Sequence, residues 1–118
     1  MNKESVKIPY NGKTGAIINL KDKKIYIEKN LSSNERRELV AIAGAYVEFY
    51  ADEGKIPKHE EALIFAAYSL IPNGNENCFG KPVSSFSAKE LASLAGVTED
   101  FAKFRLGLEK VVFDPSNN

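Results

Sequence analysis

Residues 34–50 have the sequence NERRELVAIAGAYVEFY, and this stretch decides the fold. Its apolar side chains recur at intervals of three and four residues, which is the spacing of one helix face. They are Leu39, Ile42, Ala43, Tyr46, Val47 and Tyr50. Ser32 and Glu35 have the spacing of a capping box at the start, and Gly54 suits the end. The wide apolar stripe predicts a long helix against which other elements pack.

The segment before this helix predicts a β-hairpin. Residues 15–20 form an apolar run, and residues 24–28 alternate polar and apolar after a short turn. In the second segment Ile25 and Ile27 share one face. Because an isolated hairpin is marginally stable in water, it should pack on the 34–50 helix.

A second helix is expected from about Lys58 to Ile71, between Pro57 and Pro72. Its composition is apolar on nearly every side, with Phe65 on the same face as several alanines. That pattern predicts a helix in the centre of the core.

A pair of short helices should close the chain. Ser87 and Glu90 form a capping box, Gly96 suits a helix end, and Thr98 begins a further helix. The elements together predict an α+β fold: a small single domain over residues 1–118, with an N-terminal β-hairpin or sheet packed on two central helices plus a C-terminal helix pair.

The amino-acid composition limits the functions that the chain can have. Its 118 residues fit one domain, and its 16 basic and 16 acidic side chains give no bulk attraction to nucleic acid. A single cysteine excludes an internal disulfide. We expect no signal peptide and no membrane span, and therefore a cytoplasmic protein. The polar segment 1–13 and residues 114–118 are expected to be flexible.

Three blocks of the chain, in their order, resemble the ImmA/IrrE-type metallopeptidase family. They are residues 33–37, the run Glu61 to Pro72 with its Glu-Ala and Phe-Ala-Ala, and residues 91–106. The resemblance implies a compact zincin-like scaffold of phage or mobile-element origin. Members of the family cleave a repressor in phages and mobile elements.

The positions of the zinc chemistry are replaced. In the resembled family the long helix carries H-E-x-x-H, in which two histidines four residues apart bind zinc and the glutamate acts on its water. Those places hold Ile42, Ala43 and Tyr46, and a further place that is often histidine holds Tyr50. Glu61 alone remains at the place of a ligand. We therefore expect no catalytic residues, no metal, no cofactor, and a former cleft filled with side chains.

Each remaining candidate also has an ordinary structural interpretation. Glu61 suits a helix N-terminus as well as a partner contact. Tyr46 and Tyr50 share a face and, with Glu61, could line a groove for a partner, or pack as core residues. His59 is expected to be an exposed residue of the first helical turn.

The sequence thus predicts a non-catalytic, metallopeptidase-like protein that acts as a protein-binding or regulatory module, with a repressor or another regulator as its partner. One alternative is a DNA-binding regulator that uses a helix-turn-helix over residues 87–110. Its second helix begins Glu99-Asp100 and offers only Lys103, Arg105 and Lys110 to DNA, so we do not expect a nucleic-acid partner. A second alternative is an enzyme with an unrecognised site.

Overall fold

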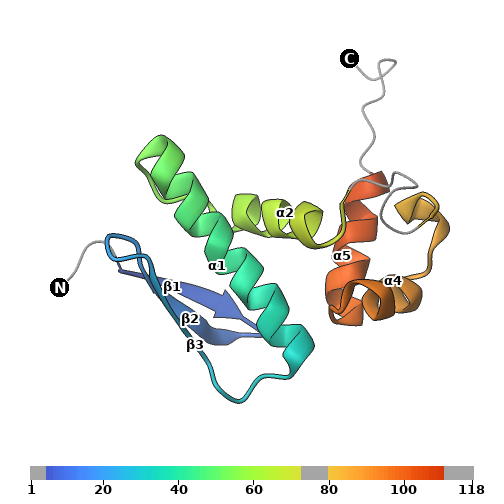
Figure 1. Ribbon diagram of the computed structural model, residues 1–118, viewed down its shortest axis with the longest axis horizontal. Helices are drawn as coiled ribbons and strands as arrows, with labels where there is room; N and C mark the ends of the chain where they lie inside the picture. The colour runs from blue at the N-terminus through green and yellow to red at the C-terminus, as the bar shows by residue number, and fades with distance from the viewer. Residues whose placement is uncertain (1–4, 73–79, 111–118) are drawn as a thin grey trace.

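The computed structural model describes residues 5–72 and 80–110 (Figure 1). In chain order the elements are β1 (Ser5–Tyr10), β2 (Lys13–Asn19), β3 (Lys24–Ile27), α1 (Ser33–Glu53), α2 (His59–Leu70), the 3-10 helix η1 (Val83–Ser85), α4 (Ala88–Ala95) and α5 (Glu99–Lys110). The single cysteine, Cys78, and the expected flexible segment 114–118 lie outside the described residues. The elements confirm an α+β fold.

The three strands form one antiparallel sheet in the order β1-β2-β3. β1 differs from the expectation of a flexible segment over residues 1–13. Asn11 and Gly12 connect β1 to β2 with φ angles of 52° and 81°, which are the positive values that a two-residue hairpin turn requires. Pro9 is tolerated because β1 is an edge strand and the register shifts at this point.

α1 begins and ends where its capping residues predict. Ser32 accepts a hydrogen bond from the backbone of Glu35, and the Glu35 side chain accepts one from the backbone of Ser32. Gly54 closes the helix in the left-handed conformation. α1 contacts β2 and β3 as well as α2, so the expected packing of the hairpin and of the second helix on α1 is confirmed.

Gly15 lets the sheet approach α1 closely. A Cβ atom at this position would lie 2.5 Å from Cβ of Tyr10 and 2.9 Å from Cδ2 of Leu39. Since real Cβ atoms do not make such contacts, a larger residue would push β2 away from α1 or displace the Tyr10 ring.

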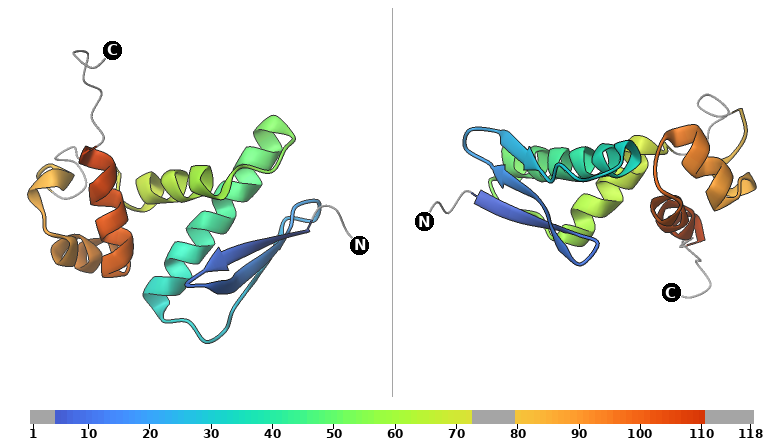
Figure 2. Two further views of the ribbon diagram at one scale, coloured as in Figure 1. Left: turned by 180° about the vertical axis from the view of Figure 1, so that it is seen from behind. Right: turned by 90° about the horizontal axis from the view of Figure 1, so that it is seen from below.

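The α4–α5 pair lies at one end of the molecule, beside the first turns of α1 and the end of α2 (Figures 1 and 2). The first turns of α1 hold the connection between α4 and α5. Arg37 Nε donates to the Ala95 carbonyl at 3.0 Å, and Asn34 Nδ2 donates to the Val97 carbonyl at 3.2 Å. Glu38, which is 2% exposed, accepts from the Thr98 backbone and from the Tyr10 hydroxyl.

One continuous core joins these layers. Its buried side chains include Ile8, Ile18, Leu20, Leu39, Ile42, Tyr46, Ala62, Ala66, Leu91 and Phe101. Across the ranges 5–72 and 80–110, none of the helices combines the length and the apolar character needed to cross a bilayer.

Candidate functional site

The α1 residues that the resemblance would align with a metal site lie inside the core. Ile42, Ala43 and Tyr46 are 1%, 0% and 3% exposed. Aliphatic and aromatic atoms therefore occupy this side of α1, and none of the three side chains faces an open cleft. Within the described residues, no group of three or more His, Cys, Asp or Glu side chains is placed to hold a metal ion.

Tyr46 is paired with His59, which is half-buried rather than exposed as the sequence suggested. The Tyr46 hydroxyl lies 2.7 Å from His59 Nδ1, and the two rings are tilted by 40° with centroids 6.0 Å apart. Burial raises the pKa of Tyr46 and lowers the pKa of His59. The pair therefore favours the neutral imidazole and ties the start of α2 to the middle of α1.

Glu61 has the role of a capping residue. Its Oε1 accepts a hydrogen bond of 2.9 Å from the backbone nitrogen of Lys58, at the start of α2. The side chain is exposed, unlike those of Ile42 and Tyr46, which are buried in the core. The structure thus gives Glu61 the ordinary role of a first-turn glutamate, with one face of its side chain left open to a groove.

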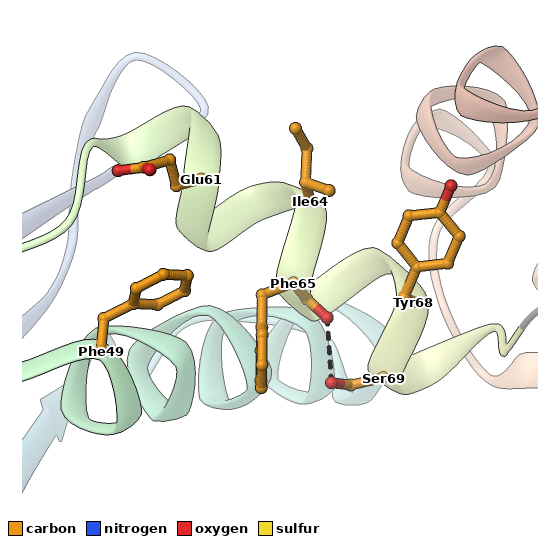
Figure 3. Close-up of a pocket in the computed structure, with 6 residues that line it drawn as sticks. All are labelled: Phe49, Glu61, Ile64, Phe65, Tyr68 and Ser69. Atoms are coloured by element: carbon orange, nitrogen blue, oxygen red, sulfur yellow. Dashed lines mark hydrogen bonds between the residues drawn. The ribbon is translucent and has the colours of Figure 1, made fainter. Parts of the chain in front are cut away.

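That groove runs along α2 and has a volume of about 490 Å³. It is lined by Phe49, Glu61, Ile64, Phe65, Tyr68 and Ser69 (Figure 3). Phe49 comes from α1, and its ring meets Phe65 edge to face with centroids 5.8 Å apart at 71°. The size lies within the range of ordinary ligand and peptide sites.

The orientation of α2 corrects the expectation of a central core helix. Ala62, Ala66 and Ala67 are each 0% exposed, whereas Phe65 is 44% exposed and Tyr68 is 36% exposed. The small side chains pack inward and let α2 approach the core closely, so the aromatic side chains point outward. The sequence of α2 has apolar residues on nearly every side of the helix, so it does not indicate which face is buried.

The far end of the groove is fixed by Arg105 of α5. This side chain is 0% exposed, its guanidinium carbon lies 4.2 Å from the centroid of the Tyr68 ring, and its Nε donates to the Ile71 carbonyl at 2.7 Å. Glu109 pairs with Arg105 Nη1 at 2.6 Å. Arg105 therefore positions Tyr68 and joins the end of α2 to α5.

Of the three residues expected in a partner groove, only Glu61 lines this one. Tyr46 is in the core, and Tyr50 is half-buried against it. The aromatic residues that do line the groove were missed as a site, because the sequence predicted that the whole second helix lies in the centre of the core.

The α4–α5 pair has the order helix, turn, helix, with Gly96 in the left-handed conformation. Its second helix, however, buries Arg105 entirely. Lys103 and Lys110 are exposed basic residues of α5, and they share its surface with Glu99 and Asp100. Base and phosphate contacts need exposed cationic side chains, so this surface is poorly suited to DNA.

No family model matches the chain, and no curated protein or solved structure matches it either. The assignment of a function therefore rests on the residues and on the geometry described above.

Proposed function

We propose that this chain is a non-catalytic, metallopeptidase-like protein of phage or mobile-element origin that binds a protein partner in the cytoplasm. The partner would be a repressor or another regulator. The buried Ile42, Ala43 and Tyr46 support a scaffold without the zinc chemistry of the resembled family.

The exposed aromatic face of α2 is the observation on which the proposal depends. An aromatic side chain has roughly 200 Å² of surface, so exposures of 44% at Phe65 and 36% at Tyr68 leave about 80 Å² of each in water. At about 25 cal/mol per Å², covering each would contribute about 2 kcal/mol. Two adjacent aromatic side chains beside Ile64 and Phe49 form a contiguous apolar surface, which is typical of an interaction site.

The site has the features of a protein contact rather than of a reaction centre. Two of its polar side chains are already engaged, because Glu61 caps α2 and the Ser69 hydroxyl donates to the Phe65 carbonyl at 2.9 Å. No nucleophile and base lie within hydrogen-bond reach of each other along its lining, whereas catalysis of hydrolysis needs such a pair or a metal-bound water. Apolar contact is therefore what this groove offers.

The test compares two serine-to-lysine variants. Ser69 in the groove and Ser93 on α4 are both exposed helical serines. Ser69→Lys places a long charged side chain across the groove without removing an apolar contact, and Ser93→Lys makes the same change elsewhere. The tagged protein would be used to capture partners from cells that naturally express it, followed by mass spectrometry.

We expect a defined partner to be captured by the wild type and by the Ser93 variant, and to be lost with the Ser69 variant. Equal capture by both variants would remove the groove from the proposal. One zinc ion bound tightly per purified chain, together with zinc-dependent peptide hydrolysis, would overturn the non-catalytic assignment.

A further inference from the structure

The C-terminal turn of α1 has charges that run against the helix dipole. Glu35 is favourably placed in the first turn, but Asp52 and Glu53 lie in the last turn, which has no basic residue. Carboxylates are disfavoured at a helix C-terminus, where the dipole is negative. Asp52 and Glu53 therefore do not serve the stability of α1, and their position needs another explanation.

These carboxylates lie close in sequence to Phe49 and Glu61, the two groove residues nearest the junction of α1 and α2. Asp52 and Glu53 follow Phe49 by three and four residues and so continue its side of α1. Glu60 and Glu61 begin α2 at the same junction of the two helices. All four are exposed, and none forms an ion pair with another described residue.

The exposed lysines of the junction do not balance this charge. Lys55 and Lys58 lie between the two helices, so four carboxylates and two ammonium groups leave a net charge of −2. At the opposite end of the groove, the charge of Arg105 beneath Tyr68 is paired with Glu109. One end of the groove therefore lies beside acidic side chains, and the other end is lined by the uncharged Tyr68 and Ser69.

The length of the groove matches two turns of a helix. One face of α2 supplies five of the lining residues: Glu61, Ile64, Phe65, Tyr68 and Ser69. The eight steps from residue 61 to residue 69, at 1.5 Å each, span about 12 Å. Three side chains at positions i, i+4 and i+7 of a second helix span about 10 Å. A partner helix can thus place three apolar anchors along the groove.

We propose that the groove binds one amphipathic helix whose three anchors are apolar and whose lysine or arginine residues lie at the end that meets Glu60, Glu61, Asp52 and Glu53. This inference rests on the proposed function and names the chemistry of the partner at the same site. Apolar contact supplies the affinity, and the acidic end selects the partner and its direction in the groove.

The probes are synthetic alanine-based peptides of about 14 residues, since shorter helices are marginal in water. The first has leucine anchors at i, i+4 and i+7 with lysines in its terminal turn. The second is identical except that glutamate replaces those lysines. Affinity is measured by fluorescence anisotropy at low salt and again at high salt.

The charge test uses matched protein variants. Glu60→Gln with Glu61→Gln removes two charges from the groove end, and glutamine keeps an oxygen for the cap of α2. Glu99→Gln with Asp100→Asn removes two exposed charges from the first turn of α5, so both variants change a helix start in the same way. Circular dichroism and thermal unfolding confirm that both fold.

We expect the lysine peptide to bind at least about tenfold more tightly than the glutamate peptide at low salt, with the preference reduced at high salt. The Glu60/Glu61 variant should lower the preference to about threefold, and the α5 variant should leave it unchanged. Equal binding of the two peptides would overturn the partner chemistry. So would an unchanged preference in the Glu60/Glu61 variant, or no measurable binding of the lysine peptide.

The two proposals fail in different ways. If Ser69→Lys abolishes capture of a cellular partner while the peptides show no charge preference, the groove is a binding site for a partner of another chemistry. If the lysine peptide binds the Ser69 variant as tightly as it binds the wild type, the peptide is bound outside the groove and the inference is wrong.

Discussion

Replacement of Arg105 by alanine tests most directly whether the C-terminal helices use this arginine as a buried structural residue. The guanidinium group makes contacts that alanine cannot make, among them a hydrogen bond to the Ile71 carbonyl, a pair with Glu109 and a stack on Tyr68. A charge-assisted bond to a buried carbonyl contributes about 1.5–3 kcal/mol. The stack on a partly exposed ring contributes about 0.5–1 kcal/mol, and the pair with the partly exposed Glu109 contributes a similar amount.

The expected cost of Arg105→Ala is therefore about 3–5 kcal/mol, which agrees with the usual effect of breaking a buried pair. For a domain of this size that corresponds to a fall of roughly 10–20 °C in the midpoint of thermal unfolding. Lys103→Ala is the control, since Lys103 is an exposed lysine on the same helix and should change stability by less than about 0.5 kcal/mol.

Circular dichroism during heating and chemical denaturation would measure both variants, and a gel shift with duplex DNA at low salt would be run beside them. A cost below about 1 kcal/mol for Arg105→Ala would refute the assignment of Arg105 as a buried structural residue. A shifted DNA band in the wild type, weakened equally by both alanine variants in folded protein, would revive the helix-turn-helix alternative.

Three further predictions follow from individual contacts. Burial lowers the pKa of His59 below its ordinary 6.5, so the unfolded state binds the proton at a higher pH than the folded state does. Thermal stability should therefore fall as the pH drops below 6.5. The His59→Gln variant should show a smaller fall. Glu38→Ala should cost about 2–4 kcal/mol in chemical denaturation, because Tyr10 and Thr98 lose a buried acceptor. Gly15→Ala should lower the unfolding midpoint by several degrees, corresponding to about 1–3 kcal/mol of overpacking.

Local signals in the sequence predict most of the fold. The capping boxes of Ser32 and Ser87 lie where the sequence places them, and Gly54 and Gly96 close their helices in the left-handed conformation. These signals are reliable because each depends on a few neighbouring residues. β1 was missed although Asn11-Gly12 is a strong hairpin signal, because Pro9 and the polar composition of the segment argued for a turn.

The candidate site could be predicted only in part, because it depends on contacts between distant residues. The capping role of Glu61 follows from its position in the first turn of α2. The pairing of Tyr46 with His59 depends on how α1 and α2 are placed, which no local pattern specifies. Arginine is rarely fully buried, so the residue type alone gives no reason to expect Arg105 inside the protein.

The separation between the two faces of α2 links the fold to the proposed function. The alanines at positions 62, 66 and 67 provide the contact with the core, and their burial would be the same with lysine or glutamate on the outer face. Polar residues are the ordinary choice for the exposed side of a helix. The chain instead places Phe65 and Tyr68 there, where part of each aromatic surface stays in water. That exposed part contributes nothing to packing within the described residues, and the partner that we propose would cover it.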